Sequence, residues 1–305
     1  MSRKVGILKA LDQILTVYIT KTQQEEIATW LAGVRAPKAW LEIASRAIPM
    51  VDDSVAAALR IILQEYLSRL PNITIPDGLQ GKQLQAALVE ELRTKMFNNN
   101  EPIIEAFEES LQGLDQVFID AANVELAMIS DSIASGAVGV VSNFDLDMVN
   151  NDAIEYMRHK AIITRDVMLK TNEAFITSTL ATGISNGDTM DQMAKQLEEG
   201  WGFGQNRSYM IARTEVLSAC NAGTYTGYKA SGVVKGRQWV ASMDSRTRKS
   251  HRLADLQQRV LGEPFNVGKY LMMYPGDGSL GAPAKEIIHC RCTTISILAD
   301  TYQGD

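Results

Sequence analysis

Apolar residues recur every three or four positions through most of the first 230 residues, which is the spacing of amphipathic helices. Thr22, with Glu25 three positions later, forms a capping box for the second of these helices, and Asp52 or Asp53 can cap the third. A loop is expected over 71–78, since two prolines and a glycine exclude a helix there. The stripes predict helices over 8–18, 22–34, 52–70, 84–96 and 104–136.

The helical period is lost between residues 136 and 151, and we place a domain boundary there. Helices are expected again over 154–183, 188–197 and 206–230, with Gly183 and Gly232 as stops. Runs of β-branched and aromatic residues then predict strands over 233–240 and 293–298.

The pattern as a whole predicts an α+β protein, with a mostly helical N-terminal region followed by a mixed α+β C-terminal module that holds a small sheet. We expect two domains, a helical scaffold over 1–140 and the mixed module over 150–300.

Composition adds few constraints. With 305 residues, 46% of them hydrophobic and 22% charged, the chain is typical of a globular protein of about two domains. It has no apolar run long enough for a membrane helix, and its N-terminus lacks the apolar block of a signal peptide, so we expect a cytosolic product and no membrane partner. Three cysteines argue against a disulfide framework and favour reduced thiols or metal ligands.

Charge is distributed unevenly. The net charge is -6, yet residues 229–259 hold eight Lys and Arg residues against two Asp. Within that segment, Arg246, Arg248, Lys249 and Arg252 could neutralise DNA phosphates without any base contact. The alternatives are a solvated helix face, or arginines that pair with carboxylates inside the fold.

Two of the three cysteines and two of the three histidines fall within the last 55 residues. Cys290 and Cys292 are two positions apart, so on a strand both sulfurs point to the same face, where they could bind one zinc ion. On the same alternation His289 points the other way, which makes His251 the better third ligand and Asp244 a candidate fourth.

Two other roles stay open for the same residues. The cysteines could be small buried hydrophobic residues, with His251 hydrogen-bonded to the backbone. Alternatively, a cysteine could be a nucleophile activated by His251 and an acid such as Asp244 or Asp277, as in a thiol-dependent hydrolase.

A longer set of spaced residues resembles the phage Mu F-like head morphogenesis family over roughly residues 150–298. These residues are Arg213, Glu215, Asn221, Trp239, Asp244, Arg246, Arg248, His251, Phe265, Tyr274, Asp277, Pro283, Cys290, Arg291 and Cys292. Two departures stand out: Leu256 follows Asp255 where the family often has glycine, and His289 replaces the asparagine that tends to precede Cys-Arg-Cys.

The resemblance implies a minor head protein of a tailed phage, and not an enzyme. Such a protein would act in head morphogenesis at the portal vertex, with the portal protein and other head proteins as partners and several copies per particle. It would be found in the virion and, during assembly, in the host cytoplasm. We expect the N-terminal helices to dock on the partner, and the basic segment to contact the genome.

An enzymatic alternative rests on the same family. ADP-ribosyltransferases are often linked to it, so Arg213, Glu215 and the strand of Trp239 could be remnants of a nucleotide-binding cleft. The simpler interpretation is that Arg213 and Glu215 form an ion pair that joins the long helix to the loop of Asp244.

Overall fold

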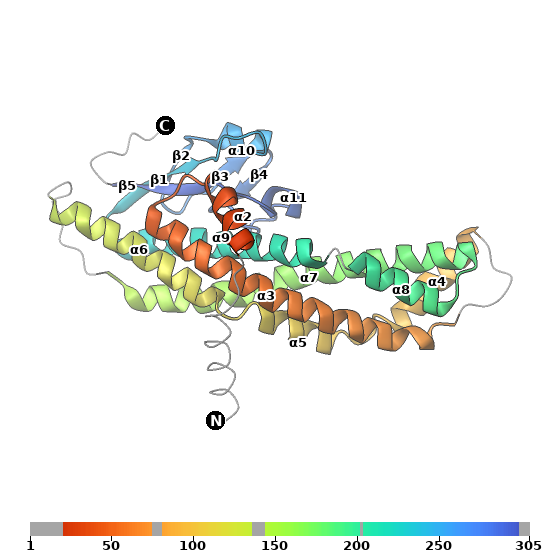
Figure 1. Cartoon of the computed structure of the whole chain (residues 1–305). Helices are drawn as coiled ribbons and strands as arrows, with labels where there is room; N and C mark the ends of the chain where they lie inside the picture. Colours follow the sequence, from red (N-terminus) through yellow and green to blue (C-terminus); the bar gives the residue numbers. More distant parts are fainter. Residues whose placement is uncertain (1–20, 75–80, 136–143, 202–203, 299–305) are drawn as a thin grey trace, which may run out of the picture. The chain divides into compact units, whose positions relative to one another are not determined.

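The computed structural model describes residues 21–74, 81–135, 144–201 and 204–298 (Figure 1). Helices dominate up to residue 231, and short strands follow, so the expected α+β class is confirmed. The helices are α2 (Lys21–Leu31), α3 (Lys38–Arg69), the 3-10 turn η1 (Leu70–Asn72), α4 (Gly81–Lys95), α5 (Glu101–Ser110), α6 (Leu114–Ala134), α7 (Leu146–Asn186), α8 (Met190–Trp201) and α9 (Gly204–Ser231). The expected helix over 8–18 lies outside the described residues.

Three predicted boundaries were wrong. Helix α3 begins at Lys38 and not near Asp52, because the stripe that includes Trp40, Ile43 and Ile48 is buried without a break, and Pro49 lies within the helix. The helix expected over 104–136 is two helices, since Gly113 adopts a φ of 98° between them.

Helix α7 continues past Gly183 and ends at Asn186, where Gly187 has a φ of 77°. Gly183 instead lies against Met193, whose Cγ would be 2.5 Å from a Cβ at that position. It is therefore a packing glycine rather than a helix stop. By contrast, Gly232 ends α9 as expected, with a φ of 68°.

The C-terminal part holds a three-stranded antiparallel sheet with the order β2-β1-β5. Its strands are β1 (Val234–Val240), β2 (Gln258–Val260) and β5 (Thr293–Leu298), and both predicted strands are confirmed. A separate hairpin pairs β3 (Phe265–Val267) with β4 (Tyr270–Met272), and two short helices, α10 (Lys249–Ala254) and α11 (Ala284–Ile287), complete the module.

The described residues form two compact units. Unit 1 draws on Met1–Val51, Leu114–Ile154 and Ala212–Asp305, and unit 2 on Asp52–Gly113 and Glu155–Ile211. Each unit therefore combines segments from both sides of residue 140. The expected boundary between 136 and 151 falls largely outside the described residues, and the assignment of separate roles to 1–140 and 150–300 stays a prediction.

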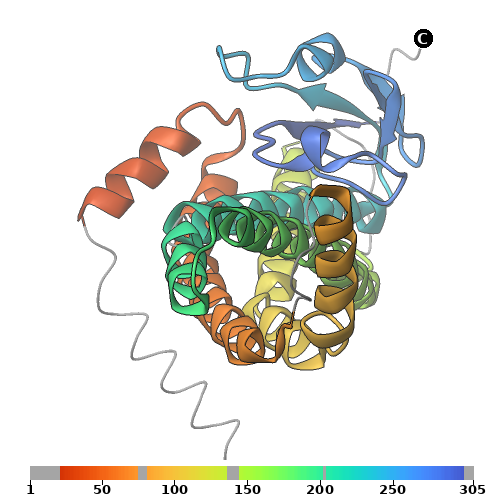
Figure 2. The same cartoon turned by 90° about the vertical axis from the view of Figure 1, so that its right-hand side faces the viewer.

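In unit 1 the sheet lies on one side of α9, as the blue strands and the teal helix show in two views (Figures 1 and 2). Tyr228 of α9 donates a hydrogen bond from its hydroxyl to the carbonyl of Thr294, at 3.0 Å. On α9, Gly223 and Gly227 lie against the backbone of α6, next to the carbonyls of Phe118 and Ala122. The long helix α9 is therefore held between the sheet and α6.

The secondary-structure elements that the structure describes in unit 2 are all helices. Its packing is centred on Tyr66, which is fully buried and lies 6.2 Å from Trp201, ring centroid to ring centroid. The indole nitrogen of Trp201 donates to the carbonyl of Leu59 at 2.9 Å, so the end of α8 is fixed to the middle of α3.

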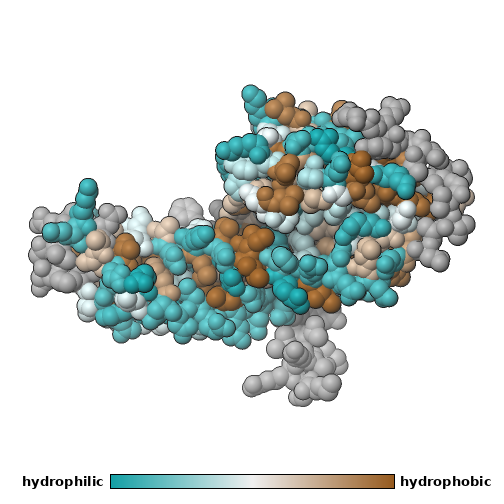
Figure 3. Space-filling model, turned by 180° about the vertical axis from the view of Figure 1, so that it is seen from behind, coloured by the Kyte–Doolittle hydropathy of each residue, from teal (hydrophilic) through white to brown (hydrophobic). Residues whose placement is uncertain are grey.

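Apolar residues also reach the surface, where Figure 3 shows them as brown patches among hydrophilic residues. Leu253, in α10, is 72% exposed, and Leu256, just after this helix, is 59% exposed. Leu256 and Met243, which is also exposed, have positive φ angles of 64° and 55°. Such strained, exposed apolar residues are candidates for contact with a partner.

Candidate functional site

The structure brings His251, Cys290 and Cys292 together in unit 1, which confirms that they form one cluster. Nδ1 of His251, on α10, lies 3.5 Å from Sγ of Cys290 and 3.4 Å from Sγ of Cys292. Their exposed fractions are 1%, 6% and 2%. The two cysteines precede β5 rather than lying in it, but the extended segment still turns both sulfurs to the same side.

The far side of the His251 ring faces an acid. Nε2 of His251 lies 3.3 Å from Oε2 of Glu286, and the Ser250 hydroxyl donates to the same carboxylate oxygen at 2.8 Å. The ring also packs edge-on against Trp239, with centroids 5.7 Å apart. The imidazole is thus fixed in orientation, with Nδ1 toward the two sulfurs.

The two thiols have different acidities. The hydrogen bond from Cys292, and then the contact with His251, hold the pKa of Cys290 well below its usual value despite burial. The partner thiol of Cys292 has its pKa raised well above the usual value by that same hydrogen bond and by burial. Burial would lower the pKa of His251, but the neighbouring Cys290 raises it overall. The cluster can therefore hold negative charge on sulfur, as a cation site or a thiolate–imidazolium pair requires.

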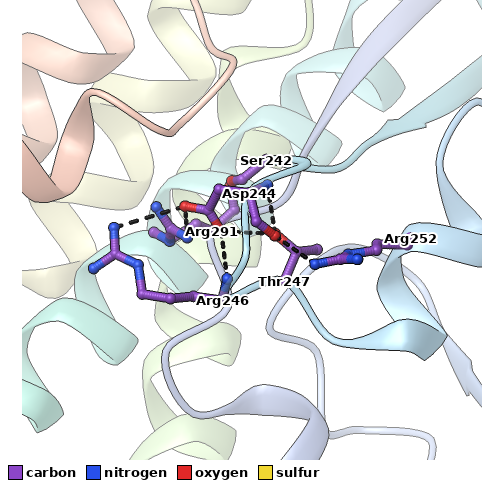
Figure 4. Close-up of polar contacts among 6 residues, drawn as sticks. All are labelled: Ser242, Asp244, Arg246, Thr247, Arg252 and Arg291. Carbon is purple, nitrogen blue, oxygen red and sulfur yellow. Dashed lines mark hydrogen bonds and ion pairs between the residues drawn. The ribbon is translucent and has the colours of Figure 1, made fainter.

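Asp244 lies outside this cluster, and the expectation that it would be a fourth ligand is not met. Its carboxylate accepts hydrogen bonds from the Arg291 guanidinium, from the Thr247 hydroxyl at 3.1 Å and from the backbone N–H of Arg246 at 3.0 Å (Figure 4). The hydrogen bond from Arg291, the largest cause, lowers the pKa of Asp244 to about 2. Arg291, the residue between the two cysteines, therefore binds the carboxylate of Asp244.

The N-terminal part of unit 1 packs on the Asp244–Arg291 pair, which the sequence did not predict. Gly33 lies so close to Arg291 Nη1 that a Cβ would clash with it. Two residues later, Arg35 donates from Nη1 to the carbonyl of Ala241 at 3.2 Å, and its own carbonyl accepts from the Thr293 hydroxyl at 2.7 Å. No local sequence signal marks this loop, because its partners lie more than 200 positions away.

Most of the remaining motif residues have internal roles. Asn221 donates from Nδ2 to the carbonyl of Cys292 at 3.1 Å, and Trp239 is fully buried. Asp277 accepts from the backbone N–H groups of Met273 and Ser279, each at 2.8 Å. Glu215 is 3% exposed on α9.

Arginines surround the residue before the cysteine pair. Burial, and then the charges of Arg213, Arg248, Arg291 and Arg246, lower the pKa of His289 to about 4. His289 has a φ of 59°, and its N–H donates to the Thr214 hydroxyl at 3.2 Å. Arg213 also lies over the ring of Trp30, at 5.0 Å, which links α9 to α2.

The basic segment is not a uniform exposed surface. Arg237 is fully buried between the rings of Tyr225 and Phe265, at 4.6 and 4.7 Å. Of the four residues expected to contact DNA, Arg248 donates to the carbonyl of Ile288 and Arg252 to that of Asp244. Arg246, Lys249 and Arg252 are nevertheless exposed, and the Arg246 guanidinium lies 3.6 Å from Asp244 Oδ2. DNA contact by these residues stays a prediction.

The fold and the cluster define a small α+β module, in which a sheet packs on the long helix α9 and a Cys-Arg-Cys segment precedes the last strand. Residues 174–295 match the family described as Phage Mu protein F like protein, so this segment of the chain is similar to that family. By its description, the family connects this segment with a phage protein.

Similarity to a curated protein is partial. The chain is 27% identical over 126 residues to the NAD(+)--arginine ADP-ribosyltransferase EFV of Enterococcus faecalis (strain ATCC 700802 / V583). The match covers 40% of this chain and 25% of that protein, so the chain spans about a quarter of this relative's length. No solved structure matches the chain significantly. Among the described residues, no helix combines the length and apolar character needed to cross a membrane.

Proposed function

We propose that this protein is a minor head protein that acts in phage head morphogenesis at the portal vertex, in a few copies per particle. The observation that carries the proposal is the family match over residues 174–295, which spans α9, the strands β1 to β4, the Cys-Arg-Cys segment and the first half of β5. The internal roles of Asn221, Asp277 and Arg291 support it, because these motif residues make hydrogen bonds that stabilise the module.

The partner contacts would combine helices and the exposed apolar residues around α10. Leu253 and Leu256 offer apolar area without being needed in the core, since both are more than half exposed. The portal protein and other head proteins are the partners that this role requires. Genome contact would fall to exposed cations such as Arg246 and Lys249.

An ADP-ribosyltransferase is the competing candidate, because the curated relative carries that activity in its name. The matched length of 126 residues is close to the length of the segment 174–295, and it is a quarter of the relative. We therefore propose that the two chains share the head-morphogenesis module, and that the transferase activity belongs to the rest of the relative.

The test is to count this protein in purified phage particles and to locate it. We expect a few copies at one vertex, by quantitative mass spectrometry and gold labelling of the tagged full chain. A Leu253→Ser, Leu256→Ser variant should fold normally and be incorporated less. A matched control is Val89→Ser, which alters an exposed apolar residue of unit 2.

Two outcomes would contradict the proposal. One is particles that lack the protein altogether. The other is transfer of labelled ADP-ribose from NAD to arginine side chains by the isolated full chain, at a rate that depends on its concentration.

A further inference from the structure

We infer that His251, Cys290 and Cys292 bind one zinc ion, with Nδ1 of the histidine and the two thiolates as ligands, and that the ion stabilises the C-terminal module. The inference goes beyond head assembly, and it rests on the geometry of the cluster. Among the described residues, these three are the group whose ligand atoms converge, all within 4.8 Å of one another.

The spacing of the ligand atoms fits tetrahedral zinc. With Zn–S bonds of about 2.3 Å and a Zn–N bond of about 2.05 Å, a tetrahedral angle places sulfur about 3.6 Å from nitrogen. The two Nδ1–Sγ distances are 3.4 and 3.5 Å. Both Nδ1–Sγ distances are therefore within a few tenths of an ångström of those in a tetrahedral zinc site.

The surroundings of His251 match those of a metal ligand. A ligating histidine usually directs its other ring nitrogen to a carboxylate, which fixes the tautomer that leaves the ligating nitrogen free. Glu286 lies on that side of the ring, with Oε2 3.3 Å from Nε2, which is an ion-pair distance without hydrogen-bond alignment, and the Ser250 hydroxyl donates to the same carboxylate. Glu286 is therefore a positioning residue for the metal site.

The backbone around the cysteines is fixed as well. Asn221 of α9 donates to the carbonyl of Cys292, and the N–H of Cys290 donates to the carbonyl of Ile287 at 3.1 Å. The third cysteine, Cys220, is fully buried on α9 outside the cluster, and burial raises the pKa of its thiol. Cys290 and Cys292 are thus placed for a shared ligand, whereas Cys220 is a core residue.

Burial decides what kind of site this is. Three protein ligands leave the fourth position of zinc to a water molecule, as in catalytic sites, but catalysis also needs access for a substrate. Here each ligand residue is 6% exposed or less. The ion would therefore link α10 to the chain before β5, across 41 sequence positions, and add stability to a module with a small core.

The experiment uses the full chain, purified under reducing conditions, with zinc measured by inductively coupled plasma mass spectrometry. We expect about one zinc ion per chain in the native protein. The Cys292→Ala and His251→Ala variants should each lose at least about tenfold in affinity for added Zn²⁺. Cys220→Ala is the matched control, because it removes a buried cysteine outside the cluster and should keep the ion.

Cobalt substitution of the unaltered chain avoids any dependence on variants that fail to fold. Bound Co²⁺ should give the thiolate charge-transfer band and the intense visible bands of a tetrahedral site. The inference is overturned if added Zn²⁺ or Co²⁺ fails to bind the reduced native chain, or if Cys292→Ala binds zinc as tightly as Cys220→Ala does.

Glu286→Gln tests the positioning role separately. We expect this variant to keep the ion but to bind it about 10–100-fold more weakly in competition with a chromogenic chelator. Unchanged affinity would show that Glu286 has only a packing role.

Discussion

Glu125, on the α6 face that packs in unit 1, is a carboxylate in an apolar environment. It is 6% exposed, and the Ser296 hydroxyl donates to its Oε1 at 3.3 Å. Burial raises the pKa of Glu125 from 4.5 to about 7. The neutral acid is therefore the form that the fold favours, and the stability of unit 1 should depend on pH near neutrality.

The sign of this dependence follows from the raised pKa. The contribution of neutral Glu125 to the free energy of unfolding is fully present below pH 4.5. It is lost as the pH rises through about 7, because the charged carboxylate is desolvated in the folded state. The shift corresponds to a difference on the order of 3 kcal/mol. Glu125→Gln should therefore be more stable than the native chain above pH 7, with the difference shrinking toward pH 4.5.

Urea unfolding at several pH values would measure this difference. Glu26→Gln, at an exposed position of α2, is the control and should leave the pH profile unchanged. A Glu125→Gln profile that runs parallel to the native one would contradict the argument.

Arg237 shows that residue type alone does not predict whether a cation is exposed to solvent. In the sequence it is one of eight cations in a basic segment, yet the structure encloses it between two aromatic rings, and it donates to the carbonyl of Glu263. Contacts with Tyr225 and Phe265 keep this arginine away from solvent, and no local sequence pattern predicts such contacts.

At the scale of elements, the contact between α6 and α9 requires a residue without a side chain at position 223, which is Gly223. A Cβ on Gly223 would clash with the carbonyl of Phe118, which is backbone and cannot move without shifting α6. Gly223→Ala should therefore destabilise the protein by about 3 kcal/mol, through overpacking.

Gly278→Ala is the matched control, because its closest neighbour would be the flexible tip of Ile287, at 2.9 Å. Thermal melts followed by circular dichroism would compare the two variants. Equal melting temperatures would show that α6 is not held tightly against α9.

The elements that the sequence predicted well are those whose signals are local. The stripe of α4, the strands β1 and β5, and the stop at Gly232 all follow from periodicity or from a positive φ. The break at Gly113 and the continuation of α7 past Gly183 could not be predicted, because two similar glycines differ only in what packs against them.

The candidate site likewise contains residues that the sequence predicted and residues that it did not. The two-residue spacing of Cys290 and Cys292 and the nearby His251 were enough to predict one cluster. Asp244 was misplaced because its partner, Arg291, lies between the cysteines and points to the opposite side. Glu286 was missed entirely, since nothing in the sequence joins it to a histidine 35 positions earlier.

At the scale of the whole molecule, the structure predicts that a truncation at the expected domain boundary disrupts unit 1. A chain that begins near residue 150 corresponds to the expected C-terminal domain, but it lacks α6 and the loop of Gly33 and Arg35. Both belong to unit 1 and cover α9 and the Asp244–Arg291 pair. We expect this truncated chain to be insoluble or to lose cooperative unfolding.

Size-exclusion chromatography and a circular dichroism melt of the 150–305 chain would measure the effect. Removal of residues 1–20 alone, which keeps α2, α6 and the Gly33 loop, is the control. A monomeric, cooperatively melting 150–305 chain would show that this segment folds without the N-terminal part of unit 1.

The contact between Arg35 and Thr293 also fixes an order of events during synthesis. The two residues are 258 positions apart, and β5 is the last described strand of the sheet. Contacts of such long range form slowly, since a large loop must close first. While the ribosome is still translating the middle of the chain, α6 and the Arg35 loop have no C-terminal module to pack against. Unit 1 can therefore assemble only after β5 has emerged, and until then its apolar faces are exposed and accessible to chaperones.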